Sequence, residues 1–394
     1  MLLIDAEFKI FRGAIEMVKI KSAAFRSIIG FFCSLQVWSL GLALGAAPAS
    51  VLLKAKQEAE AKGYVFEGSR DEIIAKAKKE GRMRALSSLE GPTIKAMAEG
   101  FRSEYPFLNV YVEELTGTDA NQRFVLEMKS GRTPNWDVAH LATDLYNDYQ
   151  PYLKKFDLLA MAQQGVLRIP TQIIDPSSRN IIASTSTLQV VVFNKKLLAP
   201  EKVPANWEDF LKPEFKGQKF VADIRPTEIA SLVPAWGLEK TVEFARRLGA
   251  QQPVWVRGAT RIITAITLGE HALFIGPNYH TVKRAQSKDP TGALELRIIE
   301  PVPTRLSDAA SVLATAPNPY AGLLWLEFLG SPKGQKIADD FEPFGASVFI
   351  AGLAQEQATR GKKLSVVDWN HFSKMPEYQA KVVEAYGFPK AERK

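Results

Sequence analysis

Side chains suited to binding a small anion follow several short apolar segments of this sequence. Hydroxyl groups and helix starts can hold an anion, and the guanidinium fork of arginine matches a carboxylate or phosphonate. In an open α/β sheet the ligand sits outside the carboxyl ends of the strands, so residues that follow predicted strands are the candidates. On this rule the candidate ligand-binding residues are Ser87, Ser88, Thr118, Asp144, Arg225, Arg257, Thr260 and Tyr279.

Each of these candidates also has an ordinary structural explanation. Helix capping explains the hydroxyl groups equally well, and an ion pair at the surface or between lobes explains each arginine taken alone. The four histidines show none of the spacings of a zinc site, and the sequence contains no familiar nucleophile or phosphate-binding motif. We therefore expect neither an enzyme nor a cofactor, although catalytic residues far apart in the sequence would escape such a search.

The elements that must position these residues alternate in type along the chain. Between Met83 and Leu141 short apolar strands alternate with helical segments in the order β-α-β-α-β, which is typical of an open α/β sheet. Residues 181–194 form one long apolar and threonine-rich segment, which we expect to leave one lobe and enter the next. A second α/β unit follows from 219 to 275, and residues 294–303 then lead back toward the first lobe.

The N-terminal segment has the pattern of a secretory signal peptide. Lys19, Lys21 and Arg26 precede an apolar run over residues 27–44 that ends in small residues. The acidic residues before Met17 are unlike a signal leader, which makes Met17 an alternative start. A membrane anchor is the other interpretation, because the run of about 18 residues is long enough to span a bilayer. We expect cleavage and export to the periplasm.

Composition argues against a nucleic-acid partner and against disulfides. The 394 residues include 50 Lys and Arg against 43 Asp and Glu, and this net charge of +7 is spread along the chain without basic runs that alternate with aromatic residues. The only cysteine, Cys33, lies inside the apolar run, so the mature protein would have no thiolate metal ligand. The length suggests two lobes, and we expect a monomer.

Three segments, in the same order, resemble the solute-binding proteins of bacterial ABC importers. Near the end of the chain, Asn318 can cap a helix that Pro319 begins, and a Ser-Pro-x-Gly-Gln turn follows that helix. Residues 117–138 resemble the glycine-then-helix, Glu, Gly-Arg and Asp-Val pattern of these proteins. Residues 191–218 look like their hinge strand and Pro-x-x-Trp-x-Asp-Phe loop. Together the resemblance covers roughly residues 70–350.

This resemblance implies the α/β fold of type 2 periplasmic binding proteins, with two lobes joined by hinge strands around a cleft. Such proteins close on a small ligand by hinge bending and deliver it to a membrane permease. The sequence looks closest to the branch that includes ferric iron-binding proteins. Those relatives use adjacent tyrosines near the place where this chain has Asn278-Tyr279, which argues against iron. Arg225 and Arg257, each beside a predicted helix start, make an anionic solute our main interpretation.

Three alternatives remain. Ferric iron is one, with Tyr279 and His280 as the candidate metal ligands; an exported enzyme that acts on a small organic acid is another; and a sensor subunit that presents its ligand to a receptor is the third. We divide the chain into a signal peptide (1–49), an N-terminal helical extension (50–80), the first lobe (81–183), the second lobe (184–300), a return to the first lobe (301–350) and a C-terminal helical tail (351–394).

Overall fold

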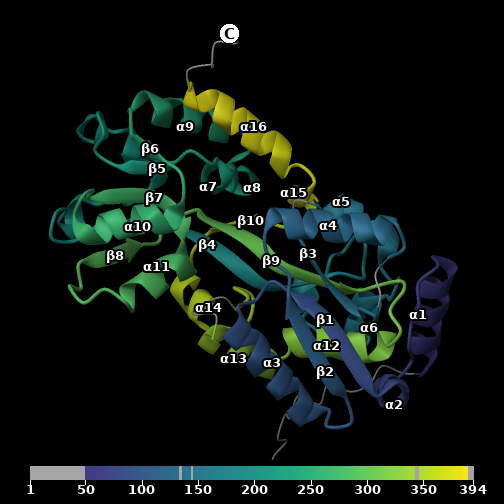
Figure 1. Ribbon diagram of the computed structural model, residues 1–394. Coiled ribbons are helices and arrows are strands. Elements are labelled where there is room, and N and C mark those ends of the chain that lie inside the picture. Colours follow the sequence, from purple (N-terminus) through teal and green to yellow (C-terminus); the bar gives the residue numbers. More distant parts are fainter. Residues whose placement is uncertain (1–48, 133–134, 143–144, 342–345, 389–394) are drawn as a thin grey trace, which may run out of the picture. The chain divides into compact units, whose positions relative to one another are not determined.

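The computed structural model describes residues 49–132, 135–142, 145–341 and 346–388, and they form the two-lobed α/β fold that the sequence predicts (Figure 1). Residues 1–48 of the predicted signal peptide (1–49) and Asp144 lie outside these residues. No helix in the described ranges is both long enough and apolar enough to cross a membrane.

The first lobe is built on three parallel strands. Its elements are the strands β1 (Arg82–Ser87), β2 (Asn109–Glu114) and β3 (Val138–Leu141) and the helices α3 (Gly91–Glu104), α4 (Thr118–Lys129), α5 (Tyr146–Tyr149) and α6 (Leu158–Gln163). Strand β1 lies between β2 and β3, with Ala85 opposite both Val112 and Val138. Strand β3 is buried along its whole length, as expected of a strand covered on both faces.

The second lobe repeats the alternation of strand and helix. Its elements are the strands β5 (Val221–Asp223), β6 (Val254–Val256), β7 (Leu273–Asn278) and β8 (Leu294–Arg297) and the helices α7 (Thr227–Ala230), α8 (Val233–Trp236), α9 (Leu238–Ala250), α10 (Ala259–Leu268) and α11 (Tyr279–Gln286). Strand β5 pairs in parallel with β6 on one side and β7 on the other. Residues 294–303, which we expected to lead back toward the first lobe, begin with β8, which pairs antiparallel with the hinge strand β4.

Two long strands connect the lobes: β4 (Ile182–Asn194) and β9 (Val302–Val312). The first part of β4 pairs antiparallel with β9, and after a register shift beyond Gln189 its second part pairs with β7 and β8. The strand order is therefore β2-β1-β3-β9-β4-β7-β5-β6. This pairing confirms that β4 runs from one lobe into the other, and all 13 of its residues are buried (Figure 1).

Helix α12 (Pro319–Gly330), which α13 (Pro332–Phe341) follows, begins with a contact other than the predicted one. The amide of Asn318 donates to the carboxylate of Asp137 at 3.2 Å and makes no capping bond. The N–H groups of Tyr320 and Ala321 instead donate to the carboxylate of Glu80, at 3.1 and 2.7 Å. An acidic residue from a preceding helix thus supplies the cap, and its charge suits a helix start.

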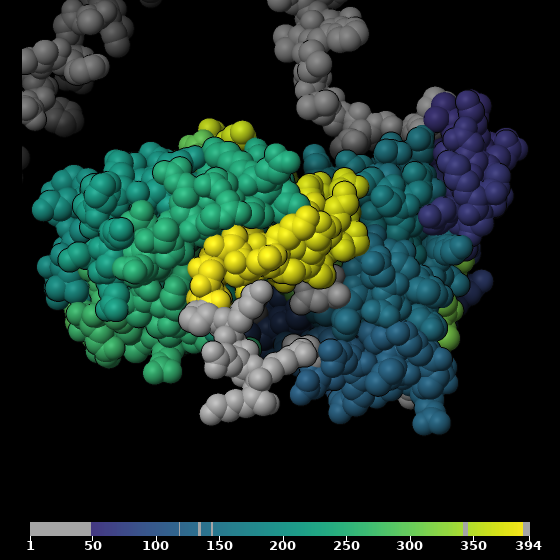
Figure 2. Space-filling model, turned by 90° about the horizontal axis from the view of Figure 1, so that it is seen from above, coloured from purple at the N-terminus to yellow at the C-terminus, as the bar shows by residue number. Residues whose placement is uncertain are grey.

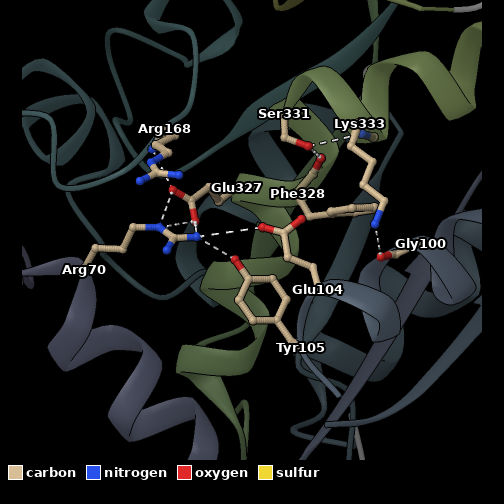
Figure 3. A network of polar contacts seen from close by, with 10 residues as sticks. Arg70, Gly100, Glu104, Tyr105, Arg168, Glu327, Phe328, Ser331 and Lys333 are labelled. Atoms are coloured by element: carbon tan, nitrogen blue, oxygen red, sulfur yellow. Dashed lines mark hydrogen bonds and ion pairs between the residues drawn. The ribbon is translucent and has the colours of Figure 1, made fainter. Parts of the chain in front are cut away.

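A buried ion pair joins α12 to the helix α2 (Arg70–Glu80). The guanidinium of Arg70 donates to both carboxylate oxygens of Glu327, from Nε at 3.1 and 3.2 Å, and to the hydroxyl of Tyr105 at 2.7 Å. The backbone N–H of Arg168 donates to the same carboxylate at 2.7 Å (Figure 3). Glu327 is only 3% exposed, so its charge is matched inside the first lobe.

The two ends of the described chain are mostly helical. Their elements are α1 (Ala49–Ala61), which precedes α2, and α14 (Ala354–Thr359), β10 (Leu364–Val367), α15 (Trp369–Phe372) and α16 (Met375–Tyr386) at the C-terminal end. The tail is thus not wholly helical, because β10 pairs in parallel with β9. Figure 2 shows α16 (yellow) between the green surface of the second lobe and the blue surface of the first.

Candidate ligand-binding cavity between the lobes

A polar cavity of about 290 Å³ lies where the hinge strands pass between the lobes. Its lining comes from the segment that follows β1, from both hinge strands and from α11 of the second lobe. The lining residues are Ser88, Leu89, Glu90, Thr185, Ser186, Thr187, His280, Arg284, Ser307 and Asp308. Both lobes therefore contribute side chains to a single cavity, and most of those side chains carry hydroxyl or charged groups.

The carboxylate of Asp308 on β9 is held by hydroxyl groups. Ser88 donates to its Oδ1, and Thr185 donates from Oγ1 to its Oδ2 at 2.7 Å. Asp308 has a φ of +49°, a left-handed conformation that aspartate tolerates better than most residues. Within the described part of the chain this carboxylate forms no ion pair, so hydroxyl groups alone orient its charge.

Two histidines near Asp308 are neutral at physiological pH. Burial lowers the pKa of His140, and the nearby Asp308 opposes this shift only in part. Burial also lowers the pKa of His280 to about 4, and the positive charges of Arg284 and Arg305 push it in the same direction. Neither imidazole therefore supplies a positive charge to match the carboxylate.

An ion pair between the lobes stands at the edge of the cavity. Arg284 on α11 donates from Nη1 to Oε1 of Glu90 at 2.6 Å, and Glu90 immediately precedes α3 of the first lobe. Two helices, α3 and α11, begin beside the cavity. The start of a helix carries a partial positive charge, so both helices favour an anion at this place.

The first-lobe candidates lie close to this cavity where the structure describes them. Ser88 lines it, and Ser87 next to it accepts a hydrogen bond from the N–H of Leu89 at 3.2 Å. Thr118 is the first residue of α4, and the position of its side chain is not described. Asp144 falls outside the described residues. The binding roles of these residues stay predictions.

The second-lobe candidates do not line this cavity. Arg225 is half exposed, and it donates to Asp223 at the end of β5 from Nε at 3.1 Å and from Nη2 at 2.6 Å. Arg257 is exposed after β6, and Thr260 lines a separate groove between α10 and α11. Tyr279 is buried at the start of α11, where burial raises its pKa. Arg225 thus already has Asp223 as a partner, and Arg257 is exposed. The binding roles of Arg225, Arg257, Thr260 and Tyr279 stay predictions.

Sequence reasoning missed most of the residues that line the cavity. It named Ser88, and it named His280 only as a metal ligand, but it did not select Asp308, Arg284 or Glu90. One signal was available: four consecutive hydroxyl residues, Ser184 to Thr187, lie in the first half of a strand that is mostly apolar beyond them. Buried hydroxyl groups need partners, so such a run in a hinge strand indicates a polar cavity beside it.

Two lobes that meet at a polar cavity, joined by long strands, define a ligand-binding protein of the hinge-bending class. The chain belongs to the family of bacterial extracellular solute-binding proteins, whose family model matches residues 115–375. It is a solute-binding protein like those that serve ABC importers, as the sequence motifs predicted. This family membership is that of transport proteins and not of enzymes.

Solved structures with the same fold have low sequence identity to this chain. A Trichodesmium protein in complex with iron and citrate ligands is 19% identical, with a TM-score of 0.60, and the match covers 78% of this chain and 98% of that one. A Bordetella ferric binding protein is 15% identical, with a TM-score of 0.61 and coverage of 78% and 98%. An ABC transporter substrate-binding protein from Agrobacterium tumefaciens is 20% identical, with a TM-score of 0.55 and coverage of 78% and 97%. These likenesses show the fold.

Proposed function

We propose that this protein captures a small anionic solute in the cavity between its lobes and delivers it to the membrane permease of an ABC importer. The observation that carries the proposal is the position of Arg284, the one cationic side chain among the described residues that line the cavity. The starts of α3 and α11 add partial positive charge on either side of it. An anion at this place would meet donors from both lobes.

Closure of the two lobes follows from the same contacts. Arg284 and Glu90 form an ion pair between the lobes at 2.6 Å, so the lobes touch at the edge of the cavity. A solute that touches both lobes gains contacts only when they close, and it shifts the equilibrium by its difference in affinity for the two states. No covalent step is needed, and our proposal is therefore transport without catalysis.

Ferric iron is the second candidate cargo, because the Trichodesmium and Bordetella proteins are described with iron. Among the described residues, no three His, Cys, Asp or Glu side chains come together in a way that would hold a metal ion. Tyr279 is buried outside the cavity lining, and Asn278 before it accepts a hydrogen bond from Gln189 at 3.0 Å. These positions favour an organic anion over iron.

Export to the periplasm is part of the same proposal. The family is extracellular, and the sequence of residues 1–49 has the pattern of a cleaved signal peptide. A protein that receives solutes outside the membrane and passes them to a permease must itself be exported.

Thermal unfolding against a panel of small carboxylates, phosphonates, polyamines and ferric citrate tests this function. A ligand at about 100 times its dissociation constant adds roughly 2.7 kcal/mol to the free energy of unfolding, which moves the midpoint by a few degrees. We expect a shift with carboxylates or phosphonates that is lost in Arg284→Ala. A shift with ferric citrate alone or polyamines alone would refute the anion proposal, and turnover of the bound ligand on prolonged incubation would indicate an enzyme.

A further inference from the structure

The charges around the cavity do not cancel within the cavity itself. Glu90 pairs with Nη1 of Arg284 at its edge, so an acid group of the solute would share this guanidinium with Glu90, and His280 is uncharged at physiological pH. Arg305 lies on β9 but is not among the residues that line the cavity. The charge left over in the lining is the carboxylate of Asp308, which the described residues contact through hydroxyl groups. Asp308 is partly buried, so water reaches its carboxylate incompletely and a hydrogen-bond donor on the ligand would stabilise its charge.

The backbone holds this carboxylate in place. Asp308 has a φ of +49° inside a hinge strand, a conformation that costs energy in most residues and needs support from its surroundings. Its hydroxyl partners come from different elements, Ser88 after β1 and Thr185 on β4. An ionised carboxylate has about four lone-pair sites and these two donors occupy two of them, so it can accept further hydrogen bonds.

We propose that the solute carries an ammonium group that donates to Asp308, in addition to the acidic group of the proposed function, on which this inference rests. The solute is then a small amino acid or an aminoalkyl sulfonate or phosphonate. Its acidic end lies toward Arg284 and the starts of α3 and α11, and its ammonium lies toward Asp308. The cavity of about 290 Å³ suits so small a zwitterion.

This arrangement also makes the cavity selective. A simple acid of the same length would bury the Asp308 carboxylate without supplying a donor, and a site built for a donor rejects ligands that lack one. A diacid would place a second negative charge against Asp308. The cavity therefore distinguishes solutes by the group opposite the acid.

The experiment uses matched sets of acids that differ only in the terminal group. For carboxylates, sulfonates and phosphonates of equal chain length, the unsubstituted, hydroxyl and amino compounds are titrated into the full-length protein by calorimetry. We expect the amino compound to bind at least about tenfold more tightly than the unsubstituted one, as charge-assisted hydrogen bonds require. The hydroxyl compound should fall between them.

Asp308→Asn removes the charge and keeps an acceptor oxygen, and asparagine also tolerates a left-handed backbone. In this variant the preference for the amino compound should fall at least about tenfold, while the unsubstituted acid binds as well as before or better. Asp148→Asn is the matched control, because it removes the same charge from an ion pair with Lys129 outside the cavity. It should leave the preference unchanged.

The possible outcomes distinguish a failure of the ammonium proposal from a failure of the proposed function on which it rests. If unsubstituted acids bind as tightly as amino acids, or hydroxy acids bind more tightly than both, the ammonium proposal is overturned and the anion proposal stands. If Asp308→Asn and Asp148→Asn weaken the amino compound equally, Asp308 is not its partner. If no acid of any set binds, the proposed function fails and this inference fails with it.

Discussion

Two carboxylates in this protein, Glu327 and Asp308, have partners of different charge. Glu327 on α12 is 3% exposed and receives the guanidinium of Arg70, so its charge is matched when the chain folds. Among the residues that the structure describes, the hydroxyl groups of Ser88 and Thr185 are the side-chain donors to Asp308 on β9. The first arrangement joins two helices of one lobe, and the second leaves a negative charge facing a cavity. We infer from this contrast that Glu327 stabilises the folded protein and that Asp308 binds the solute.

The largest effect that would test this contrast is on stability. Glu327→Gln leaves the partly buried Arg70 with only Glu104, 3.9 Å from its Nη2, as a counter-charge and should lower the free energy of unfolding by about 3–4 kcal/mol. Asp308→Asn removes an unmatched charge and should change it by less than about 1 kcal/mol in either direction. Urea unfolding measures both, provided the slope with denaturant stays constant.

A double variant provides the control for this prediction. Arg70→Met combined with Glu327→Leu removes both charges and should recover part of the lost stability, because no charge is left alone. If Glu327→Gln and Asp308→Asn destabilise the protein equally, the two carboxylates do not differ in the way proposed here.

Glu228 provides a third carboxylate and a smaller effect. It is largely buried against Gly276, and burial, with a contribution from Asp223, raises its pKa from 4.5 to about 7. Between these two pH values the folded protein holds a proton that the unfolded chain has lost. The free energy of unfolding should therefore fall as pH rises through this window, by up to about 3 kcal/mol.

Urea unfolding at about pH 5 and about pH 8 measures this dependence. Glu228→Gln cannot ionise, so its free energy of unfolding should fall less across the window than that of the original protein. Equal falls in both proteins would assign the pH dependence to other groups.

The smallest effect on stability is expected at the edge of the cavity. The Arg284–Glu90 pair is partly exposed, so Arg284→Ala should cost less than about 1 kcal/mol in the absence of ligand. Arg246→Ala is a matched control, because it removes a similar exposed pair, with Glu243, inside one helix. Thermal unfolding without solute should find the two variants alike, and a loss of several kcal/mol in Arg284→Ala alone would mean that this pair serves the fold.

Local patterns in the sequence predict much of this fold. The alternating segments from Met83 to Leu141 became strands and helices within a few residues of the predicted bounds, and residues 182–194 form the expected hinge strand. These features depend on periodicity and on helix start and stop signals, which act over short distances. The order of the family motifs predicted the two lobes correctly.

The contacts that escaped prediction join residues far apart in the sequence. Glu80 caps the helix that starts at Pro319. The side chain of Asn318, the residue expected to form this cap, donates to Asp137 instead. The position of Asp308 depends on a left-handed residue inside a strand, which no pattern in the sequence marks. The rule that ligands bind at strand ends identified Ser88. It could not show that Arg225 forms an ion pair with Asp223.

The place of β9 in the sheet has a consequence for how the chain folds. This strand lies between β3 and β4 in the sheet, yet more than a hundred residues separate the end of β4 from the start of β9 in the sequence. As the chain is synthesised, β3 and the first part of β4 must wait for a neighbour that emerges after the whole second lobe. Pairing over such distances is slow, so we expect the hinge to be among the last parts of the sheet to form.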